Sequence, residues 1–239
     1  MANIHLPFIN KAFYQAKDIG NNSKVLAQIK ADYGGLIATI SAMTKVPEKL
    51  IYAMVFIESQ GKVNAVSGRA IGLMQIDYSS AGDIIFFEFK QKRLGEAEKA
   101  LLRKYLGTRL DCILAMQYMG QKLKCNSNLG YVFTKTDLLK PELNILVGAI
   151  YLGILLDEHV ENNTIRLDKI VLRYNKGFFT KFPKGATKEM VYNAANSISQ
   201  NYIKKLAGIN SVLAIAWGIK YKVLSLRYWE KYYVQGIKY

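Results

Sequence analysis

The residues of this chain that could do chemistry stand in one short stretch, where Glu58 is followed by Gln75 and Asp77. Glu58 comes directly after the apolar run 50–57. A carboxyl group in apolar surroundings resists ionisation, so its pKa rises and it can donate a proton near neutral pH. A solvated carboxylate at a helix end is the more usual role of a glutamate. The flanking sequence therefore has to decide between a general acid and a surface charge.

The spacing of apolar residues predicts a largely buried helix that begins at Pro47 and ends near Glu58. Breakers and turn formers then follow as far as Gly68. A second apolar segment runs over 70–76, carries Gln75 and ends on Asp77. The sequence thus predicts an acid at the end of a buried helix, beside a small β-hairpin or loop region around 63–76.

Three motifs in order carry a resemblance to a known family. They are Glu58-Ser59 with Asn64–Ser67 and Gly72–Ile76, then Pro141–Ile145 leading into Gly148–Leu152, and then Leu172–Gly177, with a further likeness at Val191-Tyr192 and Tyr202. Together they resemble the signature of soluble lytic transglycosylases and their goose-type lysozyme relatives, over roughly residues 33–207. The resemblance implies a mainly α fold of the α+β lysozyme-like type, with a small β-hairpin or loop region beside the substrate groove.

The resemblance also implies a reaction on peptidoglycan glycan strands without any cofactor. Enzymes of this kind cleave the β-1,4 bond between N-acetylmuramic acid and N-acetylglucosamine. Glu58 would protonate the bridging oxygen and then, as a carboxylate, take the proton of the C6 hydroxyl, which attacks the anomeric carbon. The internal nucleophile gives a 1,6-anhydro product without water.

Five further residues receive roles from the resemblance. Ser67 and Gln75 would line the groove near the reacting sugar, and Met74 would pack beneath it. Tyr174 would face Glu58 and help to hold it, while Asn175 shapes the adjoining turn. The alternative is that Met74 and Tyr174 are core residues and that Ser67 and Asn175 are turn residues.

The sequence departs from the family pattern at several places near these residues. The spacing from Ser67 to Gly72 is shorter than usual, Gly68-Arg69 stands where Pro-x is common, and Lys176 replaces a small residue. Asp77 stands where many transglycosylases have Met-Pro, and in goose-type lysozymes an Asp here is proposed to assist attack by water. Asp77 is therefore a possible second acid, or alternatively the N-cap of the next helix.

The charge of the chain is unusual, because 33 Lys and Arg against 18 Asp and Glu give a net charge of +15. We expect the basic and aromatic C-terminal extension 208–239 to pack on the domain, or to dock on an anionic envelope polymer, a membrane surface, or virion or secretion components. Nucleic-acid binding is not favoured, because no recognised motif accompanies the charge.

The two cysteines, Cys112 and Cys125, lie 13 residues apart without a Cys-x-x-Cys pair, and the two histidines lie far from both, so the sequence predicts no metal site. A disulfide and two free thiols remain alternatives for the two cysteines. The N-terminus lacks the pattern of a signal peptide. A substrate in the periplasm or cell wall would then be reached through a virion, lysis or a dedicated secretion apparatus, so a phage or mobile-element origin is one hypothesis and a trimmed signal peptide another.

For the domain organisation we expect an N-terminal lead-in at 1–32, a lysozyme-like domain at 33–207 and a helical insertion at about 79–138. The insertion either covers the groove or forms a peripheral hairpin. Predicted helices are 24–31 after a break at Gly20–Ser23, then 34–45, 86–105, 110–122, 143–160, 167–174, 188–207 and 210–233.

Three functional hypotheses remain open at this stage. The first is a lytic transglycosylase with Glu58 as acid and base, acting in local opening of the cell wall. The second is a hydrolytic muramidase that uses Glu58 and Asp77. The third is a non-catalytic structural or envelope-binding protein on the same scaffold, for instance a virion component.

Overall fold

The computed structural model describes residues 16–115, 118–119, 122–123, 132–161, 164–177 and 180–205. The helices are α1 (Ala16–Thr44), α2 (Glu48–Ser59), α3 (Tyr78–Lys90), α4 (Glu96–Leu106), α5 (Arg109–Ala115), α6 (Lys135–Leu138), α7 (Pro141–Glu158), α8 (Leu167–Lys176) and α9 (Lys188–Asn193), and residues 197–205 are also helical. The fold is mainly α and lysozyme-like, as the resemblance implied.

The strands are short and antiparallel. They are β1 (Val66–Ser67), β2 (Ala70–Ile71), β3 (Ile76–Asp77), β4 (Tyr118–Met119), β5 (Lys122–Leu123), β6 (Val160–Glu161) and β7 (Thr164–Ile165). The first three form one sheet in the order β1-β2-β3, with Val66 opposite Ile71 and Ile71 opposite Ile76. This small sheet lies in the 63–76 region where a hairpin or loop was expected.

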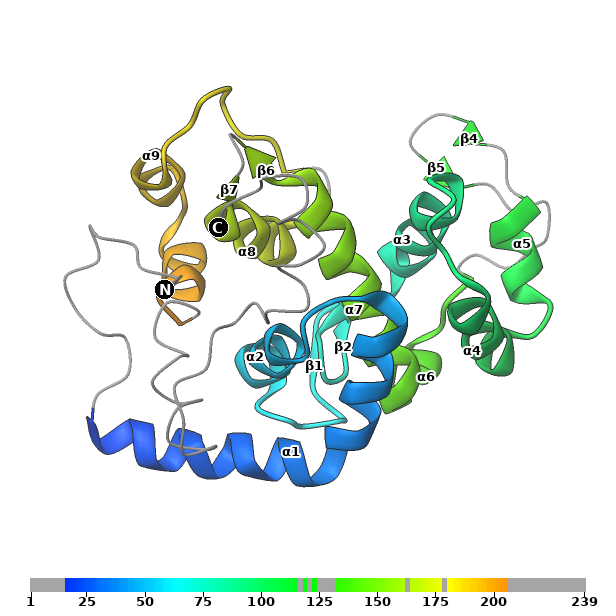
Figure 1. Cartoon of the computed structure of the whole chain (residues 1–239), viewed down its shortest axis with the longest axis horizontal. Coiled ribbons are helices and arrows are strands. Elements are labelled where there is room, and N and C mark those ends of the chain that lie inside the picture. Colours follow the sequence, from blue (N-terminus) through cyan, green and yellow to red (C-terminus); the bar gives the residue numbers. More distant parts are fainter. Residues whose placement is uncertain are drawn as a thin grey trace.

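The core is built around α7, which packs against α1, α3, α4, α6 and α8 (Figure 1). Its residues from Leu143 to Leu152 are all buried. A helix that is apolar on all sides is stable only when other elements surround it, and α7 has such elements along its length. The second buried helix, α2, begins after Pro47 as predicted and packs on α1.

The N-terminal part of the domain differs from the expectation. The predicted break at Gly20–Ser23 is wrong, because α1 runs without interruption through these residues. Leu26 and Ile29 are buried in the same core as α7, so the boundary expected at 32/33 falls inside a helix. A glycine in a helix interior costs only about 1 kcal/mol, which the burial of such side chains outweighs.

The segment 79–138, which we expected to be an insertion, contains more breaks than the apolar pattern indicated. The helix expected over 86–105 is divided into α3 and α4, with Lys92 in the left-handed region (φ 56°) between them. The helix expected over 110–122 ends at Ala115 in α5 and is followed by the β4–β5 hairpin. Figure 1 shows α4, α5 and this hairpin on the side of the molecule opposite α9.

The later helices confirm the predictions at 143–160 and 167–174, which correspond to α7 and α8. The helix expected over 188–207 is divided into α9 and a second helical segment at 197–205. Asn196 lies directly before the second segment, and its Oδ1 accepts a hydrogen bond from the backbone N–H of Ser199 at 2.9 Å. The helix expected at 210–233 and the extension 208–239 lie outside the described residues. Within the described parts of the chain, no helix is long and apolar enough to cross a bilayer.

Candidate active site

Glu58 occupies the last turn of α2, directly after the buried residues of that helix. The hydroxyl of Tyr202, from the helical segment 197–205, donates a hydrogen bond to Glu58 Oε1. Burial raises the pKa of Glu58 to about 7, although the Tyr202 hydrogen bond and the positive charge of Lys205 act in the opposite direction. Glu58 is thus a carboxyl group that exchanges a proton near neutral pH.

Tyr174 does not hold the carboxylate in the way that was expected. Its hydroxyl donates its proton to the backbone carbonyl of Met74 at 3.0 Å, and its ring stacks on Tyr151 with a centroid distance of 5.1 Å. Burial, with the nearby charge of Glu58, raises the pKa of Tyr174 far above its ordinary value. Tyr174 therefore lies near Glu58, but the tyrosine that bonds to Glu58 is Tyr202.

Asn144 of α7 fixes the loop that leads to Gln75. It is buried, and its Oδ1 accepts a hydrogen bond from the Met74 N–H at 2.8 Å. Its Nδ2 donates to the carbonyls of Ile71 at 2.8 Å and Leu138 at 2.9 Å. Gly72 has φ +78°, and a Cβ there would lie 2.4 Å from Asn144 Nδ2. The Gly-Leu-Met-Gln motif thus needs a glycine for conformation and for space at once.

Met74 and Gln75 have different places in this loop. Met74 is completely buried, and a Cβ on Gly148 of α7 would lie 2.5 Å from its sulfur. Gln75 lies in the left-handed region (φ 46°), and its Nε2 donates to the carbonyls of Ala65 at 3.0 Å and Gly72 at 2.9 Å. Since both bonds use the amide nitrogen, a hydrogen bond from a sugar would go to the carbonyl oxygen of Gln75.

A cavity of about 290 Å³ brings five of the predicted site residues together. These residues are Ser67, Gln75, Asp77, Tyr174 and Asn175, which come from the small sheet, from the turn between β2 and β3, and from α8. The cavity is also lined by the start of α3, by Tyr151 of α7, and by Arg69, Lys176 and Gly177. Glu58 does not line this cavity. Tyr174 lies between Glu58 and the cavity, because it lines the cavity and the charge of Glu58 raises its pKa.

Asp77 has a structural role that the sequence left open. It is the N-cap of α3, and its Oδ1 accepts from the Ser79 backbone N–H at 2.9 Å and from the Ser79 hydroxyl at 2.7 Å. Its other oxygen lies 3.2 Å from Arg69 Nε. Asp77 therefore caps a helix and lines the cavity at the same time.

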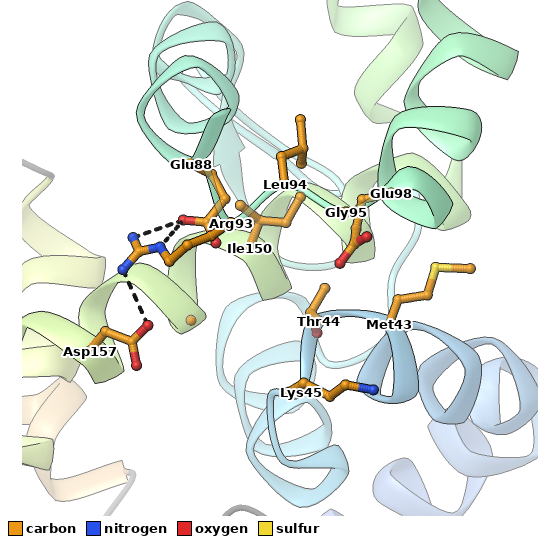
Figure 2. A pocket seen from close by; sticks show the side chains of 11 residues that line it. Met43, Thr44, Lys45, Glu88, Arg93, Leu94, Gly95, Glu98, Ile150 and Asp157 are labelled. Carbon is orange, nitrogen blue, oxygen red and sulfur yellow. Dashed lines mark hydrogen bonds and ion pairs between the residues drawn. The ribbon is translucent and has the colours of Figure 1, made fainter. Parts of the chain in front are cut away.

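A second, larger cavity of about 370 Å³ lies between the end of α1, the α3–α4 connection and α7 (Figure 2). Arg93 bonds to Glu88 and to Asp157 inside it, and Lys45, which also lines it, donates a hydrogen bond to the Ala42 carbonyl. It contains none of the residues that the sequence singled out. We therefore assign the candidate active site to the smaller cavity and Glu58.

Two residues of the site were not assigned a role from the sequence. Tyr202 appears in the family likeness, but nothing local indicates that it reaches Glu58, because the two stand 144 positions apart. Asn144 likewise belongs to the motif at the start of α7, and its polar side chain inside an apolar run was the available signal. Among the described residues, no group of three or more His, Cys, Asp or Glu side chains gathers where a metal could bind.

Comparison with known proteins finds a family match for the part of the chain that carries Glu58. Residues 35–94 match the family described as the transglycosylase SLT domain. The chain is also 39% identical over 80 residues to the membrane-bound lytic murein transglycosylase E of Buchnera aphidicola, a match that covers 33% of this chain and 36% of that protein. Residues 35–94 thus match an SLT-type transglycosylase domain, in agreement with the resemblance.

The extent of these matches defines what they support. The family match includes Glu58, Ser67, Met74, Gln75 and Asp77, and it ends in the α3–α4 connection at residue 94. Tyr174, Asn175 and Tyr202 lie beyond it. The match with the Buchnera protein spans about a third of the length of that protein.

Proposed function

We propose that the chain is a peptidoglycan lytic transglycosylase in which Glu58 acts first as general acid and then as general base. The observation that carries this proposal is the buried carboxyl group of Glu58, with a pKa raised to about 7 and a tyrosine hydroxyl on one oxygen. Such a group is protonated in part of the molecules and ionised in the rest near neutral pH. A residue that must both give and take a proton needs this balance.

The reaction would take place in two proton transfers. Protonated Glu58 gives its proton to the bridging oxygen, and the bond between that oxygen and the anomeric carbon of N-acetylmuramic acid breaks with its electron pair on the oxygen. The ionised Glu58 then removes the proton of the C6 hydroxyl of the same sugar. That oxygen attacks the anomeric carbon, which closes the 1,6-anhydro ring and returns Glu58 to its protonated form.

Tyr202 would support the second form of Glu58, because a hydroxyl that donates to a carboxylate stabilises the ionised state. Ser67 and the carbonyl oxygen of Gln75 would meet the hydroxyl and N-acetyl groups of the sugar. Met74 would pack beneath the sugar, and the Tyr174 hydroxyl fixes the backbone carbonyl of Met74 by a hydrogen bond. Asn175 accepts a hydrogen bond from the Ser199 hydroxyl at 3.0 Å, so it joins α8 to the segment that carries Tyr202.

A hydrolytic reaction is the second candidate, because Asp77 lines the same cavity. As a carboxylate it could direct a water molecule to the anomeric carbon, as second carboxylates do in other glycosidases. Against this role, both of its oxygens already have partners, in the α3 cap and in Arg69. Transglycosylation therefore remains the first candidate.

The substrate defines where the protein would act. We propose peptidoglycan glycan strands of the periplasm or cell wall, with local opening of the wall as the outcome. Delivery by a virion, lysis or a secretion apparatus, and docking of the basic extension 208–239 on an anionic envelope component, belong to the same proposal.

Product chemistry tests the proposal. Purified peptidoglycan is digested with the wild type, Glu58→Gln and Asp77→Asn, and the fragments are analysed by mass spectrometry. Fragments ending in 1,6-anhydro-N-acetylmuramic acid, made by the wild type and by Asp77→Asn but not by Glu58→Gln, are the expected result. Reducing ends, about 18 Da heavier through the added water and lost in Asp77→Asn, would establish the hydrolytic alternative. Absence of cleavage on several wall types would instead indicate a binding or structural protein.

A further inference from the structure

The two departures from the family pattern that introduce positive charge line the same cavity. Arg69 comes from the turn between β1 and β2, and Lys176 is the last residue of α8. Both line the same cavity as Gln75 and Tyr174. Two cationic side chains that the chemistry of Glu58 does not require therefore stand beside the proposed reacting sugar.

The charges of the cavity do not cancel. Its charged lining residues are Arg69, Asp77 and Lys176. Arg69 Nε pairs with Asp77 at 3.2 Å, which compensates one positive charge. Lys176 is exposed and makes no ion pair within the described parts of the chain. The cavity thus has one positive charge left over, at the end formed by α8.

This uncompensated charge is informative because the glycan of the proposed substrate carries its ionisable group at a defined position. N-acetylmuramic acid bears a lactyl arm on O3. When a peptide stem is attached, the carboxyl group of that arm is an amide without charge. When the stem has been removed, the arm ends in a free carboxylate, close to the C4 oxygen and on the sugar that reacts.

We propose that Lys176, in the cavity that Arg69 also lines, makes this cavity select glycan segments with a free carboxylate on the muramic lactyl arm. This inference rests on the proposed function and names the substrate class of that same site. It requires a prior reaction that removes the stem peptide, which is an amide hydrolysis. A carboxylate on an attached stem is the other source of the same chemistry, and the test separates the two.

The test measures binding, so that it does not depend on cleavage. The Glu58→Gln protein is titrated with three muramic-containing oligosaccharides of equal length. The first has free lactyl carboxylates, the second has them converted to neutral methylamides, and the third bears peptide stems. We expect the free-carboxylate fragment to bind about fivefold tighter than the methylamide, the size of an exposed ion pair. The preference should fall as salt is added.

Matched variants in the Glu58→Gln background assign the preference to the cavity. Lys176→Gln should abolish it and Lys176→Arg should retain it. Lys24→Gln, which removes an equal charge from an exposed position on α1, should leave it unchanged. If the stem-bearing fragment binds as tightly as the free carboxylate and also depends on Lys176, the carboxylate recognised belongs to the stem.

That result would overturn the inference, and so would two others. One is equal binding of the three fragments, and the other is a preference that persists in Lys176→Gln. A wild-type protein that cleaves none of the fragments would refute the proposed function instead, while the binding comparison would still decide the role of Lys176.

Discussion

Glu58 and Glu142 each accept a hydrogen bond from a tyrosine hydroxyl, and yet their pKa values are shifted in opposite directions. The hydroxyl of Tyr202 donates to Glu58, and the hydroxyl of Tyr105 donates to Glu142 at the start of α7. The pKa of Glu58 is raised to about 7, whereas hydrogen bonds from Lys104 and Tyr105 hold the pKa of Glu142 below its ordinary value. The tyrosine alone therefore does not decide the protonation state.

What differs is the access of water and the distance of the nearest cation. Glu142 keeps 31% of its side chain exposed and has Lys104 Nζ 2.7 Å away, so its ionised form is solvated and paired. Glu58 ends a buried helix, and burial outweighs both Tyr202 and Lys205. In this fold a carboxyl group becomes a proton donor by losing water, and its tyrosine limits how far the pKa rises.

The largest expected effect separates the two glutamates by activity. Glu58→Gln should lower the rate of glycan cleavage by about 10²- to 10⁴-fold, the contribution of a positioned acid–base group. Glu142→Gln removes a similar carboxylate outside the cavity and should change the rate by less than about twofold. The measurement is release of soluble fragments from labelled peptidoglycan, with thermal unfolding of both variants as the check on folding. Equal losses in two folded variants would contradict the assignment.

The second expectation concerns stability as a function of pH. The pKa of Glu58 rises from an ordinary 4.5 to about 7 in the folded protein, so its contribution to stability is complete below pH 4.5 and is lost as the pH rises through 7. The free energy of unfolding should therefore fall by about 2 kcal/mol between pH 5 and pH 8 through this one group.

Glu58→Gln removes that dependence because it cannot ionise. Urea unfolding of both proteins at pH 5 and pH 8 measures the effect, and the variant should gain on the wild type by about 2 kcal/mol at the higher pH. An unchanged difference between the two pH values would mean that Glu58 ionises as easily in the folded protein as in the unfolded chain.

The comparison also shows what the sequence could and could not predict. The helix that ends at Glu58 was predicted from apolar spacing and Pro47, and the loop with Gln75 was predicted from its turn formers, because both signals are local. The order of the family motifs along the chain implied that Ser67 and Tyr174 would line one cavity, and both do. The uninterrupted α1 was missed, because the buried faces of Leu26 and Ile29 become visible only with the core in place.

The partner of Glu58 was beyond local signals altogether. Tyr174 and Tyr202 are both tyrosines on late helical segments, and both are buried next to Glu58. Which of them points its hydroxyl at the carboxylate depends on how α8 and residues 197–205 pack, and the break at Asn196 sets the direction of the last segment. The sequence indicated Tyr174 beside the acid, and the structure adds the hydroxyl of Tyr202 as the hydrogen-bond donor to Glu58.

The third expectation tests whether Tyr202 limits the pKa of Glu58. Tyr202→Phe removes a hydrogen bond that favours the ionised form, so the pKa of Glu58 should rise above 7 by about one unit, the worth of a hydrogen bond to a charged group. The alkaline fall of the pH–rate profile should move upward by the same amount, and the maximal rate should also drop. Tyr174→Phe, which removes the bond to the Met74 carbonyl, is the control that should leave the alkaline limb where it is.

The smallest effect completes the comparison at Glu142. Its lowered pKa contributes stability that is present above the ordinary value of 4.5 and is lost as the pH falls through the folded value. Because the side chain is partly exposed, we expect Glu142→Gln to cost only about 0.5 kcal/mol at pH 7 and nothing measurable near pH 2. The cost should shrink in high salt, and in a Lys104→Met background. A larger cost at low pH than at pH 7 would mean that Glu142, like Glu58, is stabilised in its protonated form.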